Sequence, residues 1–143
     1  MKKIAFFFLI IIVIISTFTY LYLVYLDNCN KSQKENKKYE SYINQEITGT
    51  ELTTLINKVV DSNIQNNVQK DKKGKYIDNE ENSINIDIKF IDNDITYNIE
   101  KIYSSGTNKF FQYYGDIKFK CSITEYHKKT NKIRYMLFEQ VTQ

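Results

Sequence analysis

At 143 residues, 42% of them hydrophobic and 26% charged, the chain has the length of one small domain plus an anchoring segment. Two cysteines exclude a disulfide framework, and no zinc-like spacing of Cys and His occurs. The net charge of +3 lies in residues 1–44, where six lysines face three acids (6 − 3 = +3). The remaining 14 basic and 14 acidic residues cancel, which argues against nucleic acid as the main partner.

The first segment, Ile4 to Leu26, is a run of 23 residues without a formal charge. As a helix it spans about 34 Å, enough to cross the ~30 Å hydrocarbon core of a bilayer. Tyrosines gather at its C-terminal end, where they favour the headgroup interface. We therefore predict a transmembrane anchor over residues 1–27, with the lipid bilayer as its partner and the flanking lysines beside anionic headgroups. Its representative residues are Ile4, Phe8, Ile12, Ile15, Tyr20, Tyr25 and Leu26.

A cleaved signal peptide is the alternative interpretation of this segment. Such a peptide has a shorter apolar core and small residues before its cleavage site, and residues 25–29 lack that pattern. Asp27 and Asn28 also stand where a lipoprotein signal ahead of Cys29 has small apolar residues. Lysines lie on both sides of the run, so charge does not decide orientation. The short N-terminal tail is typical of an uncleaved signal anchor, which predicts a single-pass cell-membrane protein with N-in, C-out topology.

Residues 28–46 form a polar juxtamembrane stalk, either a helical continuation of the anchor or a flexible tether. Residues 47–143 form a small α+β domain. Its first helix begins with a capping box, in which Thr48 accepts from the N–H of Glu51 and Glu51 reaches back to Thr48. Ile47 and Leu52 are the expected hydrophobic staple. One apolar face follows at helical spacing, made of Leu52, Leu55, Ile56 and Val59.

Two hairpins are predicted beyond the polar loop from Asn66 to Asn82. The first has alternating apolar positions on both strands and a turn at residues 92–94. Its inward positions are Ile84, Ile86, Ile88 and Phe90, then Ile95, Tyr97 and Ile99. In the second hairpin, residues 128–131 form the turn. One face is assigned Ile117, Phe119, Cys121 and Ile123; the last strand has Ile133, Tyr135 and Leu137 on one face and Met136 and Phe138 on the other.

A helix over residues 104–114 separates the hairpins, with Phe110, Phe111 and Tyr114 on its apolar face and Gly115 as its stop. The last strand is apolar on both sides, which is typical of a central or covered strand. The element order therefore predicts an anchor followed by helix–hairpin–helix–hairpin. We expect the hairpins to form a four-stranded antiparallel sheet with the helices on one face.

Charge divides between the two hairpins, the first being mostly acidic and the second mostly basic. This division predicts a polar surface for a protein partner or for head-to-tail self-association; the alternative is two solvated strand faces, or a sheet whose hairpins attract each other. The latter is the more common origin of such runs. The candidate interaction surface consists of Asp87, Lys89, Lys118, Lys120, Lys128, Lys129, Lys132 and Arg134.

No pattern predicts an enzyme, a cofactor or a metal ion. Residues 92–94 resemble a fragment of a calcium loop but lack its central Gly and distal Glu. His127, beside a turn, is expected to be an exposed surface residue. Cys121 lies six residues from His127, about 20 Å along an extended strand, so the two do not form a nucleophile–base pair.

A basic N-terminal stub, a long apolar helix that continues into a stalk, and a small antiparallel sheet resemble the layout of type IV pilins and pseudopilin-like proteins. The layout is also similar to that of small single-pass membrane proteins of Gram-positive bacteria. At the start of the apolar run Ala5 is the only small residue, and Ile10 stands where the pilin processing signal has an acid. The pilin resemblance implies a structural component of an envelope assembly.

These observations predict a membrane-anchored extracytoplasmic interaction domain, within an envelope, pilus-like or secretion assembly. The alternative is a membrane-tethered module that senses or binds a ligand through its sheet face or through the loop from Asn66 to Asn82.

Overall fold

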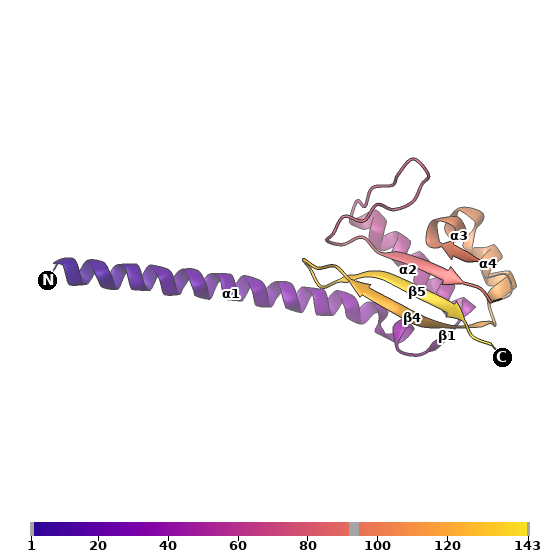
Figure 1. Ribbon diagram of the computed structural model, residues 1–143, viewed down its shortest axis with the longest axis horizontal. Coiled ribbons are helices and arrows are strands. Elements are labelled where there is room, and N and C mark those ends of the chain that lie inside the picture. Colours follow the sequence, from indigo (N-terminus) through magenta and orange to yellow (C-terminus); the bar gives the residue numbers. More distant parts are fainter. Residues whose placement is uncertain (1, 92–94, 143) are drawn as a thin grey trace.

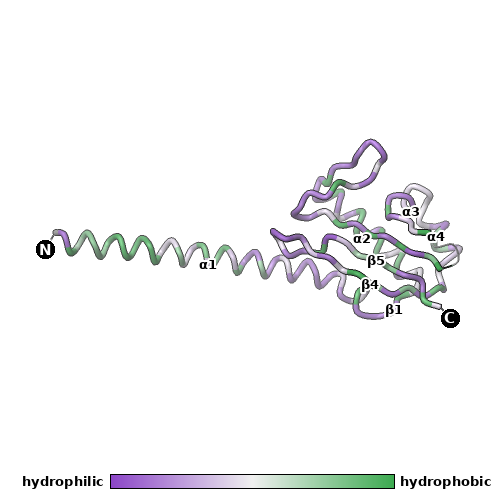
Figure 2. Tube along the Cα trace, in the orientation of Figure 1, coloured by the Kyte–Doolittle hydropathy of each residue, from purple (hydrophilic) through white to green (hydrophobic). Residues whose placement is uncertain are grey.

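In the computed structural model, which describes residues 2–91 and 95–142, the anchor and the stalk form one continuous helix, α1 (Lys2–Ile43). At 1.5 Å per residue this helix is about 63 Å long. Its first half projects from the domain as an isolated rod, and its second half packs along the domain (Figure 1). The first half is apolar and the second half polar (Figure 2). Of the two alternatives for residues 28–46, the helical continuation is therefore the one observed over most of the segment.

The second helix, α2 (Gly49–Gln65), begins as its sequence predicts. Thr48 accepts a hydrogen bond from the N–H of Glu51, and the Glu51 carboxylate accepts one from the Thr48 N–H at 2.8 Å. Ile47 and Leu52, which flank this capping box, are both buried. The predicted apolar face is confirmed, because Leu55, Ile56 and Val59 are also fully buried.

Five strands form one mixed sheet in the order β1-β4-β5-β2-β3. The strands are β1 (Glu46–Thr48), β2 (Asn85–Lys89), β3 (Thr96–Asn98), β4 (Lys118–Tyr126) and β5 (Ile133–Gln140). The predicted four-stranded antiparallel sheet is wrong on two counts: β1 adds a fifth strand, and β2 pairs with β5 in parallel. Both errors arise because a three-residue strand shows no alternation, and hairpin patterns do not specify which strands of two hairpins meet.

Local pairing follows the sequence more closely. β2 pairs with β3 and β4 pairs with β5, both antiparallel, and β5 lies inside the sheet between β4 and β2. The central position predicted for the last strand is therefore confirmed. β3 ends at Asn98, and Ile99 begins the next helix instead of extending the strand. The predicted turn at residues 92–94 lies outside the described residues.

Two β-bulges move side chains away from their predicted faces. One lies between Cys121 and Ile123, and beyond it Ile123 is 44% exposed although Phe119 is fully buried. A second lies where Tyr126 pairs with Ile133, and it places Ile133 in the core. Tyr135 and Leu137 remain half-buried, so the shared face predicted for these two residues and Ile133 is wrong. An extra residue on one strand reverses the alternation from that point on.

The predicted helix over residues 104–114 is in fact the end of one helix and the whole of another. α3 (Ile99–Ser105) and α4 (Thr107–Tyr114) are separated by Gly106, whose φ of 91° interrupts the helical path. Phe110 is buried, whereas Phe111 is 49% exposed and does not belong to the inward face as expected. Phe110 and Tyr114 pack with Phe90 and Phe119 in an aromatic cluster.

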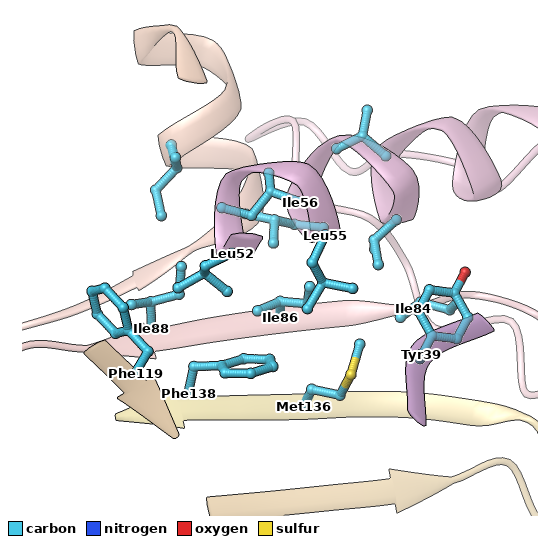
Figure 3. Close-up of a cluster of buried hydrophobic side chains, with 14 of the residues drawn as sticks. Tyr39, Leu52, Leu55, Ile56, Ile84, Ile86, Ile88, Phe119, Met136 and Phe138 are labelled. Atoms are coloured by element: carbon cyan, nitrogen blue, oxygen red, sulfur yellow. The ribbon is translucent and has the colours of Figure 1, made fainter. Parts of the chain in front are cut away.

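The core lies between one face of the sheet and the helices α2, α3 and α4 (Figure 1). Figure 3 shows Leu52, Leu55 and Ile56 of α2 above Ile86, Ile88, Met136 and Phe138 of the sheet, with Tyr39 of α1 closing one end. None of the described helices covers the opposite face of the sheet, so the described part of the domain has one covered and one uncovered face.

Gly49, the first residue of α2, provides a test of this packing. A Cβ built at Gly49 would lie 1.8 Å from the backbone oxygen of Tyr114, so any side chain must push α2 away from the end of α4. We expect Gly49→Ala to lower the free energy of unfolding by several kcal/mol, of the order seen for overpacked cores. Chemical denaturation measures the loss. Thr54→Ala, at an exposed site of the same helix, is the control and should change stability little.

Candidate functional site

The first feature with functional meaning is the bare apolar surface of α1. Ile4, Phe8, Ile12, Ile15, Tyr20, Tyr25 and Leu26 are between 37% and 68% exposed. In length and composition α1 is the one helix among the described residues that is able to cross a membrane, and a signal sequence meets the same criteria. The hydroxyls of Ser16, Thr17 and Thr19 donate to backbone oxygens one turn earlier, so none of the three needs water as a hydrogen-bond partner.

The second feature is a set of contacts that fixes α1 to the domain. The Ser32 hydroxyl donates to the backbone oxygen of Thr130. Asn36 is bound on both sides of its amide: Nδ2 donates to the Asn131 oxygen and Oδ1 accepts from the Ile133 N–H, each at 2.9 Å. One turn later Tyr39 is only 4% exposed within the core. The second half of α1 is therefore an integral part of the folded domain.

Sequence reasoning missed these contacts because it treated residues 28–46 as a solvated stalk. A signal for them is present: Ser32, Asn36, Tyr39 and Ile43 recur at spacings of four, three and four, which places them on one helix face. Two of the four are polar, so the pattern does not resemble an ordinary apolar stripe. Ser32 and Asn36 form hydrogen bonds with backbone atoms of the β4–β5 turn instead of packing against a hydrophobic partner.

His127 lies at the base of this turn and is buried, at 2% exposure, so its predicted surface position is wrong. Its Nε2 lies 2.7 Å from the Ser83 backbone oxygen, and its Nδ1 lies 3.7 Å from Oδ1 of Asp78. The loop between α2 and β2 covers the ring. The group does not form a nucleophilic triad, because the Ser83 hydroxyl donates to Asp78 at 3.1 Å and is not directed at the imidazole.

Arg134 links this loop to β4. Its guanidinium donates to Oδ2 of Asp78 at 2.7 Å and also contacts Glu125. Burial pushes the pKa of Asp78 upward, but the hydrogen bonds from Arg134, the Glu80 N–H and the Ser83 hydroxyl outweigh it. The net pKa therefore lies below the ordinary 3.8.

Because the pKa of Asp78 is lower in the folded state than in the unfolded state, the free energy of unfolding falls as the pH is lowered. The contribution of Asp78 is present above its unfolded-state pKa and is lost as pH falls through the lower folded-state value. We expect Asp78→Asn to lower stability near neutral pH and to flatten the decline of stability below about pH 4. Urea denaturation across a pH series measures this. Asp61→Asn, at an exposed carboxylate of α2, should leave the acid limb steep; an unchanged limb in Asp78→Asn would refute the assignment.

The predicted interaction residues fall into two separate groups. Asp87, Lys89, Lys118 and Lys120 lie on strands, with Lys120 paired in register with both Glu46 and Glu139. Lys128, Lys129 and Lys132 lie at the β4–β5 turn, and Arg134 is the second residue of β5. Some charges pair within the domain: Lys118 with Glu46 at 3.9 Å and Lys129 with Glu80 at 3.2 Å. Lys129–Glu80 joins the basic segment to the acidic one, as does Arg134–Asp78, whereas Glu46 lies outside both segments.

Tyr135 gives the uncovered face a fixed polar contact. Its hydroxyl donates to Oδ2 of Asp87 at 3.1 Å, across the parallel β2–β5 pair. Burial and the neighbouring Asp87 carboxylate raise the pKa of Tyr135 to about 12, so the phenol stays protonated and remains a donor at neutral pH.

Two grooves, each of about 520 Å³, lie on the domain. One is bounded by α1, α2 and Lys132; the other lies between the loop of residues 70–76 and α3, with Lys70, Lys73, Lys75 and Lys101 along it. The described residues contain no group of three or more potential metal ligands. Cys121 is half-buried, and burial raises the pKa of its thiol, which makes it a poor nucleophile.

Comparison of the chain with protein-family models, with curated proteins and with solved structures finds no significant match.

Proposed function

We propose that the chain is a single-pass membrane protein that presents an extracytoplasmic interaction domain to a protein partner, as a component of an envelope assembly of pilus-like or secretion type. The observation that carries this proposal is α1. Its first half is apolar and exposed, its second half is held in the domain by Ser32, Asn36 and Tyr39, and no break in the helix separates the halves. Such a helix sets both the height and the orientation of the domain above a bilayer.

The layout supports an assembly role. The pilin resemblance rests on the order of the elements, an apolar N-terminal helix that continues into a polar helix before a sheet, and it implies a structural component. The uncovered face of the sheet, with Asp87, Lys89, Lys118 and Lys120, is the surface we assign to the partner. Lys120 lies opposite Glu46 and Glu139, which offset part of the positive charge of this face. We therefore expect shape complementarity and hydrogen bonds to contribute to partner recognition as much as net charge does.

Site-specific photocrosslinking in intact cells tests the proposal. A photoreactive side chain at Lys120, on the uncovered face, should give a discrete crosslinked species; the same group at Asn57 or Lys72 should give none. Asn57 is exposed on α2 and Lys72 on the loop between α2 and β2, both away from that face. A monomer at every position would contradict the proposal.

Topology is tested with Lys72→Cys, which a membrane-impermeant maleimide should label without lysis if the domain is extracytoplasmic.

A second candidate, a ligand-binding module, is favoured by the groove beside residues 70–76. Four lysines lie along it, and Glu100 and Tyr76 join its walls through a 2.7 Å hydrogen bond. This composition suits a phosphate-bearing ligand. Thermal shift of the full chain with inorganic phosphate and with glycerol phosphate tests it, since binding raises the melting temperature by mass action. Lys70→Gln with Lys73→Gln should abolish the shift, and no shift in the wild type would exclude this candidate.

A further inference from the structure

The β4–β5 turn lies closer to the N-terminal rod than any other part of the sheet (Figure 1). The contact between Ser32 and Thr130 fixes its height. Ser32 follows Leu26, the end of the apolar run, by six residues, which is about 9 Å of helix. The headgroup layer extends roughly 5–8 Å beyond the hydrocarbon on each side of a bilayer. The turn is therefore held at the outer edge of the headgroups by the fold itself.

Lysines from two distant parts of the sequence lie at this height or up to about 8 Å farther from the apolar run. Lys34 and Lys37 come from α1, and Lys128 and Lys132 flank the turn. None of these four makes an ion pair with another described residue. The other charges at this end are largely paired: Lys31 with Asp27, Lys38 with Glu35, Lys129 with Glu80 and Arg134 with Asp78. Two exposed acids at this end make no ion pair with a described residue: Glu81 on the adjoining loop, whose backbone oxygen accepts from Thr130, and Glu40 on α1. Against the four lysines they leave positive charge in excess.

We propose that the β4–β5 turn docks on anionic phospholipid headgroups through Lys128 and Lys132, together with Lys34 and Lys37 of α1. This inference rests on the proposed membrane anchoring. Exposed lysines within a Debye length of an anionic surface are attracted to it, and lysine tolerates the variable geometry of lipid phosphates. Docking would give the domain a second attachment point beside α1 and leave the uncovered sheet face free for a partner.

The experiment uses the full chain in nanodiscs of phosphatidylcholine alone or with about 40% phosphatidylglycerol, an anionic lipid. Acetylation rates of individual lysines are measured by mass spectrometry. We expect Lys128 and Lys132 to react at least about fivefold more slowly on the anionic discs, the change that about 1 kcal/mol per lysine implies. Lys72, on the loop between α2 and β2, should react equally on both. High salt should remove the protection, because surface charges are screened.

A matched pair of variants separates docking from a general effect of anionic lipid. In Lys128→Gln with Lys132→Gln, the rate at Lys129 on anionic discs should return to its value on neutral discs. Lys72→Gln with Lys109→Gln, at two exposed lysines outside the turn and outside the lysine groove, should leave the protection of Lys128 intact. Equal rates on both discs, or equal slowing at Lys72, would overturn docking while anchoring stands. Failure of the chain to co-elute with either disc would overturn the anchoring and the docking together.

Discussion

Lysine at Ile12 and Ile15 is expected to release the chain from membranes. Both side chains lie near the middle of the apolar run, at 62% and 59% exposure on α1, so no other described part of the domain covers the new charges. On the insertion scale, each exchange of a central isoleucine for lysine costs roughly 3–4 kcal/mol. The pair therefore costs about 6–8 kcal/mol, comparable to the whole gain of the apolar run on the same scale.

Alkaline extraction of membranes followed by ultracentrifugation measures the effect. The wild type should remain in the pellet and the double variant should move to the supernatant. Asn30→Lys with Ser41→Lys places the same charges on exposed positions beyond Leu26 and should leave the chain in the pellet. A full-length wild-type chain in the supernatant would contradict the anchor, and a mature protein that begins beyond Leu26 would show that the segment is a cleaved signal sequence.

Phe138→Ala is expected to cause the largest loss of stability in the domain. Phe138 is fully buried on β5, the strand between β4 and β2, and it lies beneath α2 (Figure 3). Truncation of a buried phenylalanine costs about 3–5 kcal/mol, through lost transfer energy and the cavity left behind. For a domain near 100 residues this lowers the melting temperature by more than about 10 °C.

Thermal unfolding of the full chain in detergent, followed by near-UV circular dichroism of its tyrosines, measures this loss. Phe111→Ala is the matched control, because Phe111 is 49% exposed on α4 and its truncation should cost less than about 1 kcal/mol. A smaller effect at Phe138 than at Phe111 would contradict both the position of β5 and the covered face of the sheet.

Patterns of short range were sufficient for much of the fold. The capping box at Thr48 and Glu51, the apolar face of α2 and the inner position of β5 all follow from neighbours within a few residues. The β-bulges could not be predicted in this way, because an inserted residue does not change the composition of a strand. It only shifts the alternation of buried and exposed residues, as it does around Ile133. The edge strand β1 was missed because three residues carry too little periodicity.

The candidate site was the part least accessible from the sequence. His127 next to two lysines has the composition of an exposed turn, yet Ser83 and Asp78, more than forty residues away, enclose its ring. The sequence also grouped Lys128, Lys129 and Lys132 with the strand residues, because it does not show where the β4–β5 turn lies along α1. Ser32 and Asn36 set that position.

The sequence by itself determined the apolar run from Ile4 to Leu26, the helix start at Thr48 and the alternating strands, because each depends on hydrophobic periodicity or on hydrogen bonds between near neighbours. Only the tertiary structure decided the parallel pairing of β2 with β5, the burial of His127 and the attachment of the β4–β5 turn to α1. These depend on contacts across 44 to 98 positions of the chain, where the choice of partner is made by the packing of the whole domain and not by any local preference.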